Sequence, residues 1–147
     1  MRAIVTVVSL LISATSALGQ DGVANINVYS QCDNDSVGRQ VSYYLKETIR
    51  KSSRYRLVEE YSKAGYQISL VCADPDANDV GVRTIFSYSF VVLNFRPKGF
   101  YDYQLNHGIY RCGSGKVESC AKGLMASFDD EVSKMKKRII AGDFDPF

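Results

Sequence analysis

The sequence predicts an α/β domain of the two-layer α+β kind, in which one mixed sheet carries two helices on a single face. Two segments, near residues 37–51 and 117–139, repeat apolar side chains every three or four residues, which is typical of amphipathic helices. Shorter segments alternate apolar and polar side chains, as half-buried strands do. The resulting order along the chain is β-α-β-β-β-β-α, and a single sheet with both helices on one face is its simplest closure.

The strand predictions depend on this alternation. The first segment reads V-A-N-I-N-V-Y, and the fourth sets aromatic and branched side chains on one face and Ser87 and Ser89 on a wetter one. A right-handed crossover through the first helix would place the first strand parallel to the third and near it. The predicted strands are 23–32, 55–59, 65–73, 83–95 and 101–109, with a loop at 74–81 and a hairpin turn at 96–99.

Residue types at the ends of the helical segments fit helix termini. The run 33–36 (D-N-D-S) offers several N-cap candidates for the first helix, whose charged outer face is expected to be solvated. Lysines and an arginine near the end of the last helix suit its dipole. Gly142 is expected to stop that helix, so that residues 141–147 form a frayed tail.

Residues 1–19 have the pattern of a secretory signal peptide. Arg2 supplies the positive start, and residues 3–14 form an uncharged apolar run that is too short to span a bilayer. Ala17 and Gly19 are small residues at the two positions that a signal peptidase reads. We therefore expect export followed by cleavage after Gly19.

Cleavage there would leave a single domain of residues 20–147, a length that can bury a core of its own. Gln20 stands where a lipoprotein signal would need cysteine, so no lipid anchor is expected, and no other stretch is apolar enough for a membrane span. Loss of Arg2 reduces the formal charge from +2 to +1, which gives no net field to attract a nucleic acid or an acidic substrate. The expected product is a soluble periplasmic or extracellular protein without a nucleic-acid partner.

Four cysteines in a chain that enters an oxidising compartment favour disulfide bonds over free thiols. Cys32 and Cys72 lie at the outgoing ends of two strands that are predicted to be neighbours, and Cys112 and Cys120 bracket a short glycine-containing loop. We therefore predict the pairs Cys32–Cys72 and Cys112–Cys120. A zinc site is not expected, because the spacings lack a close C-x-x-C pair.

Two segments resemble ligand-binding motifs but are incomplete. Residues 113–116 (G-S-G-K) look like the end of a phosphate loop, yet Val117 stands where serine or threonine should follow the lysine. Residues 74–78 begin like a calcium loop, yet Asp79 replaces the required glycine and Ile85 the bidentate glutamate. Neither segment therefore predicts a phosphate or calcium site.

The remaining titratable residues form no catalytic pattern. The acidic run 129–131 lies in the last helix, where it can be solvated or pair with Lys134. His107 is the only histidine, and alternation places it among the apolar residues Leu105 and Ile109, as expected of a hydrogen-bonded core or rim histidine. No G-x-S-x-G elbow is present. We therefore assign no catalytic residue and expect neither a metal ion nor a cofactor.

Tyrosine is abundant in this chain and tryptophan is absent. Tyr43 and Tyr44 are adjacent on the first helix, so both cannot face the core. Tyr44 falls on the apolar face, which leaves Tyr43 as an exposed aromatic and a candidate binding-surface residue. The alternative is an ordinary exposed tyrosine, since single surface aromatics are common.

The predicted order of strands and helices resembles that of small α/β modules in bacterial envelope assembly proteins, although no sequence motif carries the likeness. The resemblance implies a binding or assembly role. Two functions remain. We favour an exported soluble module without catalytic activity that binds a protein or an envelope component, and the alternative is a small secreted hydrolase whose carboxylates converge only in the fold. The sequence leaves the partner, the ligand and the oligomeric state open.

Overall fold

The structure is a computed structural model that describes residues 22–75, 81–93 and 102–142. Its elements are β1 (Ala24–Gln31), α1 (Ser36–Arg50), β2 (Tyr55–Leu57), β3 (Tyr66–Ala73), β4 (Arg83–Val92), β5 (Tyr103–Gly113) and α2 (Val117–Ala141), with 3-10 turns at Tyr61–Lys63 and Ser114–Lys116. Apart from the two 3-10 turns, this is the predicted order along the chain. The predicted signal peptide, the turn at 96–99, part of the 74–81 loop and residues 143–147 lie outside the described residues.

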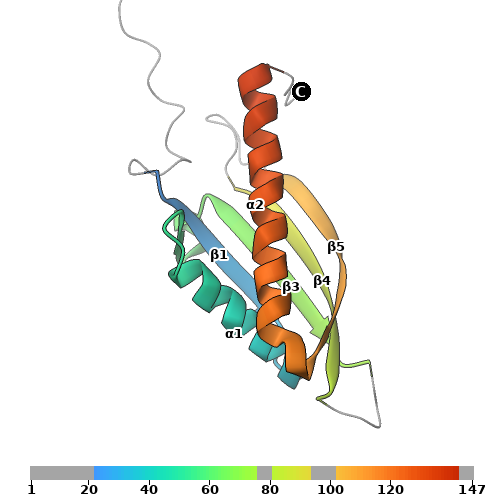
Figure 1. The fold of residues 1–147 in the computed structure, drawn as a ribbon. Coiled ribbons are helices and arrows are strands. Elements are labelled where there is room, and N and C mark those ends of the chain that lie inside the picture. The colour runs from blue at the N-terminus through green and yellow to red at the C-terminus, as the bar shows by residue number, and fades with distance from the viewer. Residues whose placement is uncertain (1–21, 76–80, 94–101, 143–147) are drawn as a thin grey trace, which may run out of the picture.

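The five strands form one mixed sheet in the order β2-β1-β3-β4-β5. β1 runs parallel to both β2 and β3, whereas β3, β4 and β5 follow one another in antiparallel pairs. Figure 1 shows α1 and α2 on the same side of this sheet, with α2 extending past it at its C-terminal end. The predicted fold class and the parallel pairing of the first and third strands are therefore confirmed, while β1 lies between β2 and β3 and the order in the sheet differs from that in the chain.

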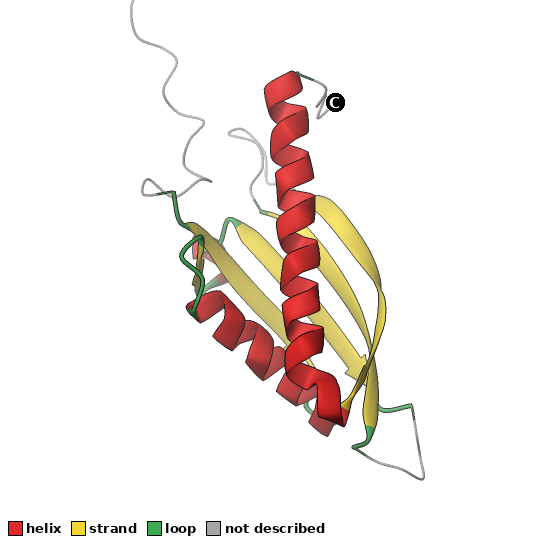
Figure 2. Ribbon diagram, viewed as in Figure 1, coloured by secondary structure: helices red, strands yellow, loops and turns green. Residues whose placement is uncertain are grey.

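The hydrophobic core fills the space between the sheet and the two helices (Figure 2). Alternation in the strands sends one set of side chains into this layer, where hydrophobic burial stabilises the domain. Phe128 of α2 packs edge-to-face against Phe90 of β4 and Tyr66 of β3, with ring centroids 5.4 and 5.5 Å apart. The largest fully buried side chains are Phe86, Phe90, Phe128, Ile26, Leu45, Ile49, Ile68, Leu70, Leu93 and Leu124.

Asp35 is the N-cap of α1 among the predicted candidates. Its Oδ1 accepts a hydrogen bond from the Gly38 N–H at 2.8 Å, and its Oδ2 accepts one from the hydroxyl of Thr84 in β4. Both oxygens of this buried carboxylate are thereby satisfied, and the start of α1 is fixed to the sheet. A Cβ added to Gly38 would stand 2.6 Å from the Cys72 Cβ, so the close approach of α1 to β3 requires glycine.

A β-bulge changes the predicted phase of β5. Phe90 lies opposite Asn106 and Val91 opposite Gln104, which leaves Leu105 as an extra residue between them. The alternation predicted to place His107 and Ile109 on the apolar face was therefore wrong. Beyond the bulge these two side chains lie on the sheet face away from the helices, and both are exposed.

The ends of two other elements also differ from the predictions. β5 continues to Gly113, and α2 runs through Ala141 before Gly142 ends it with a φ of +73° in the left-handed region. Ala141 therefore belongs to the helix rather than to a frayed tail. Within residues 22–75, 81–93 and 102–142, no helix combines the length and the apolar character needed to cross a membrane.

Candidate functional site

All four cysteines are used in disulfide bonds, in the predicted pairing. Cys32, just after β1, is joined to Cys72 in β3 with a Cα–Cα distance of 4.8 Å. Cys112 in β5 is joined to Cys120 in the first turns of α2 with a Cα–Cα distance of 6.2 Å. The first bond fixes two neighbouring parallel strands and the second fixes α2 to the sheet, so no cysteine is left as a thiol nucleophile.

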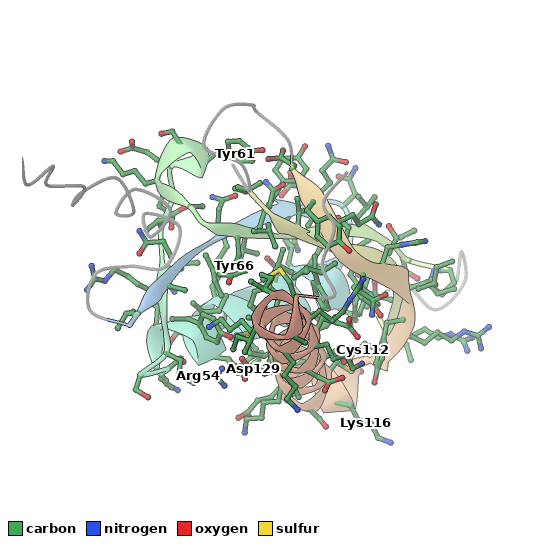
Figure 3. The ribbon with its side chains drawn as sticks, turned by 90° about the horizontal axis from the view of Figure 1, so that it is seen from above. Arg54, Tyr61, Tyr66, Cys112, Lys116 and Asp129 are labelled. Atoms are coloured by element: carbon green, nitrogen blue, oxygen red, sulfur yellow. A yellow bond between two sulfur atoms is a disulfide. The ribbon has the colours of Figure 1, made fainter. Side chains whose placement is uncertain are left out.

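The acidic run at the middle of α2 forms structural contacts. Asp129 accepts a hydrogen bond from the Tyr55 hydroxyl at 2.5 Å and lies 3.5 Å from the Arg54 guanidinium, and Figure 3 shows Arg54 and Asp129 close together beside the helix. Burial raises the pKa of Tyr55, and the hydrogen bond to Asp129 raises that pKa further. Asp130 and Glu131 pair with Lys134 at 2.7 and 2.9 Å, which is one of the two alternatives predicted for the acidic run. The hydrogen bond from Tyr55 to Asp129 joins β2 to α2, whereas the pairs with Lys134 lie within α2.

The face of the sheet away from the helices differs in composition from the core face. Over β1 on this open face, Asn25 and Asn27 donate side-chain hydrogen bonds to main-chain oxygens of Lys63, Val58 and Glu59. The segment after β2 therefore covers that part of it. Over β3, β4 and β5, neither of the two described helices lies against the open face (Figure 1).

A shallow hollow of about 320 Å³ lies on the open face over β3, β4 and β5. Cross-strand register explains its shape, because the small side chains of Ser69, Ser87 and Ser89 form its floor between larger neighbours. None of the described residues that line it is acidic, and His107 lies at its border opposite Ser89. The lining residues are Ser69, Val71, Ser87, Tyr88, Ser89, Gln104, His107, Gly108 and Ile109.

Among the described strand residues, three large hydrophobic side chains are exposed on the open face. Ile109 is 77% exposed, and Val71 and Tyr29 are each 47% exposed. Ser87 pairs with Val71 on one side and with Ile109 on the other, so these three residues form one row across the strands. Tyr29 lies in the next row, where it pairs with Ser69. We call these three residues, together with the serine-floored hollow, the open-face patch.

The open-face patch was not predicted from the sequence. The apolar Val71 falls in phase with the polar Gln67 and Ser69, and this mismatch was the available signal in β3. Ile109 could not be placed without the bulge at Leu105, which reverses the phase of its strand.

Tyr43, the predicted binding-surface residue, is exposed as expected, with 58% of its surface accessible. It lies on α1, and its ring packs edge-to-face against Tyr44 with centroids 5.4 Å apart. Since α1 covers the other face of the sheet, Tyr43 does not join the open-face patch.

The G-S-G-K run forms the end of β5 and the 3-10 turn before α2. Its residues border a second hollow of about 510 Å³, where Lys122 pairs with Glu118 at 2.8 Å. No group of three or more histidine, cysteine, aspartate or glutamate side chains that could hold a metal ion occurs in the part of the chain that the structure describes.

Neither a family model nor a curated protein matches this chain. Among solved structures it is similar to the PelC dodecamer from Paraburkholderia phytofirmans, with 14% identity, a TM-score of 0.43, and coverage of 75% of this chain and 86% of that one. It is also similar to the hypothetical protein CT253 from Chlamydia trachomatis (10% identity, TM-score 0.39, covering 81% and 99%). Rare lipoprotein B from Shewanella oneidensis is a further match (11% identity, TM-score 0.29, covering 82% and 99%). None of these is similar enough to indicate a function for this chain.

Proposed function

We propose that the mature protein is an exported, non-catalytic module that binds another protein through its open-face patch. The observation that carries the proposal is the exposure of Tyr29, Val71 and Ile109 on a sheet face that the helices leave free. On the core face of the same sheet, residues of this kind are buried. Here their apolar surface is in contact with water, which is unfavourable, and burial against a partner would remove that contact.

The chemistry of the patch defines the partner surface that fits it. The described lining of the hollow is apolar or polar without a carboxylate or a lysine. Interface centres are depleted in charged residues and enriched in aromatic ones. The partner is therefore a protein that presents an uncharged surface, with an apolar side chain for the hollow and hydrogen-bonding groups for the serines around it.

Two features support export to the periplasm or beyond the cell. Residues 1–19 have the signal-peptide pattern, and two disulfides fit an oxidising compartment. The intact mass of the secreted product should begin at Gln20, allowing for cyclisation of that glutamine. A full-length cytoplasmic chain as the main species would contradict export.

Site-specific photocross-linking in the native host tests the binding surface. A photoreactive residue at Val71 should cross-link one discrete protein, whereas the same residue at Ile140, which is 86% exposed on α2, should not. A third variant at Tyr43 separates the two candidate surfaces. Cross-linking at Tyr43 or Ile140 and none at Val71 would contradict the proposal.

The hydrolase alternative is tested with the same protein. His107 is exposed at the border of the hollow, so a His107→Ala variant is expected to fold normally, and we expect this residue to be dispensable for any chemistry. Loss of a measured hydrolytic activity in a folded His107→Ala protein would contradict the non-catalytic proposal.

A further inference from the structure

β5 forms a long free edge of the sheet. It spans 11 residues and, among the residues that the structure describes, pairs only with β4, whereas β2 at the opposite edge spans 3 residues. A free edge is a template for another strand, and proteins commonly protect such edges with short strands, lysine or proline. The β5 sequence, YQLNHGIYRCG, contains neither lysine nor proline. β2 is protected by its shortness. A β-bulge is a further protective feature of sheet edges, and β5 has one at Leu105, but residues 107–111 beyond it contain neither a bulge nor lysine or proline.

The hydrogen-bond pattern fixes which main-chain groups of β5 point outward. The Ser114 N–H donates to the Val82 carbonyl at 2.8 Å, which makes that pair a hydrogen-bonded one. Hydrogen-bonded and non-hydrogen-bonded pairs alternate along an antiparallel ladder. His107, Ile109 and Arg111 therefore direct their N–H and C=O groups away from β4.

The contacts of His107 agree with this alternation. Its N–H donates to the Asn106 side-chain oxygen at 2.7 Å rather than to β4. Its N–H thus points to the free edge, as the register requires.

The outward groups and side chains of β5 are self-complementary about Ile109. If two copies pair antiparallel about a two-fold axis at this residue, each Ile109 exchanges both of its main-chain hydrogen bonds with its counterpart. The two isoleucine side chains, each 77% exposed in one copy, then meet as a cross-strand pair on the open face.

The helix side of β5 is also complementary in this register. Tyr110 would lie opposite Gly108 of the second copy. Gly108 has no side chain, and the Tyr88 hydroxyl takes its place, 2.8 Å from where a Cβ would stand. The half-exposed ring of Tyr110 can therefore cover Gly108 and Tyr88 of the second copy, and the same contact repeats by symmetry.

β5 brings few charged side chains to this pairing. β5 contains no acidic residue, and its single arginine, Arg111, would lie opposite His107 of the second copy. Both side chains are exposed in one copy and remain at the surface of a continued sheet.

We propose that two copies of this chain associate by antiparallel pairing of their β5 strands about Ile109, so that their sheets become continuous. The inference rests on the proposed binding role and deepens it by naming one partner, a second copy at the sheet edge. The open face then extends across both copies, with Val71 on either side of the two isoleucines.

Engineered disulfides test the register. In a hydrogen-bonded antiparallel pair the Cα atoms are about 5.5 Å apart, within the range that a disulfide spans. Ile109→Cys should therefore form a covalent dimer on non-reducing gels at pH 8. His107→Cys is the matched control, because its two copies would be separated by about 13 Å along the strands and should not cross-link. Equal cross-linking at both positions, or none at Ile109→Cys, would overturn the proposal.

Sedimentation of the purified mature protein tests the association itself. The wild type should sediment as a dimer in the micromolar range, and Ile109→Pro should weaken the dimer at least about tenfold, because proline removes only an outward N–H. Thermal unfolding checks that Ile109→Pro is folded, and Val71→Ser, which leaves the edge intact, should remain dimeric. A wild type that stays monomeric, or that pairs its edge only with a different protein, would overturn the dimer. Photocross-linking at Val71 would still decide the proposed function separately.

Discussion

The two faces of the sheet are built from the same strands but have opposite composition. On the covered face, Phe86 and Phe90 of β4 are fully buried under the helices. On the open face of the same strand, Ser87 and Ser89 form the floor of a shallow hollow. Alternation along one strand therefore separates residues that stabilise the domain from residues that are free to bind.

The exposed apolar residues are the exception to this separation. Val71 and Ile109 stand among serines and glutamines, where folding does not bury them. Substitutions on the covered face should therefore lower stability, whereas substitutions in the open-face patch should lower binding.

The largest effect is expected in the core. Phe90→Ala removes a fully buried ring that packs against Phe128, and should cost about 3 to 5 kcal/mol of unfolding free energy. Urea denaturation measures this directly. A loss below about 1 kcal/mol, as expected at surface positions, would mean that the helix-covered layer is not the core.

The disulfides should contribute unequally. They close loops with sequence separations of 40 and 8 residues, for which chain entropy gives about 4 and about 2.5 kcal/mol. Replacing Cys32 and Cys72 with serine should thus lower the melting temperature more than replacing Cys112 and Cys120. Non-reducing peptide mapping checks the connectivity first. Equal melting temperatures would refute the entropic explanation, and a crossed pairing would refute the strand arrangement.

A smaller loss is expected where α1 meets the first disulfide. In Gly38→Ala the new methyl would stand 2.6 Å from the Cys72 Cβ and 2.7 Å from its sulfur, so the helix must shift, at a cost of about 1 to 3 kcal/mol. Gly115→Ala is the matched control, because nothing lies within 4 Å of a Cβ there. If both variants unfold at the wild-type denaturant concentration, α1 does not pack as closely on β3 as described.

Tyr55→Phe should have a modest effect that depends on pH. It removes the hydrogen bond to Asp129, worth about 1 to 2 kcal/mol. The pKa of Tyr55 is raised in the folded state, so above about pH 10 the unfolded chain loses its proton first and stability falls as pH rises. In that range the stability of the variant should fall less steeply with pH than that of the wild type. Some dependence on pH should remain, because burial also raises the pKa of Tyr66. Parallel slopes in denaturation at several alkaline pH values would count against this role of Tyr55.

The core between the sheet and the two helices was predicted well from the sequence, because the spacing of apolar residues along a strand or helix follows which of its faces is buried. The strands, both amphipathic helices and the pairing of Cys32 with Cys72 followed from the residues and one topological rule. The first helix showed several possible N-caps, and only the buried hydroxyl of Thr84 in a distant strand selects Asp35.

The open-face patch could not be predicted in the same way. Its members come from three strands, and their proximity depends on cross-strand register. The phase of Ile109 further depends on a bulge that leaves no clear mark in the sequence around Leu105. The exposure of Tyr43 could be predicted because adjacent residues on a helix point in different directions. Its exposure alone did not show that it lies away from the open-face patch.

The most direct test combines stability and binding in a Tyr29→Ser/Val71→Ser variant. Both residues are half exposed, so its unfolding free energy should stay within about 1 kcal/mol of the wild type. Its dissociation constant for the protein that cross-links at position 71 should rise at least about tenfold, because the apolar part of the interface is lost. An unchanged dissociation constant in this folded variant would contradict the assignment of the open face as the binding surface.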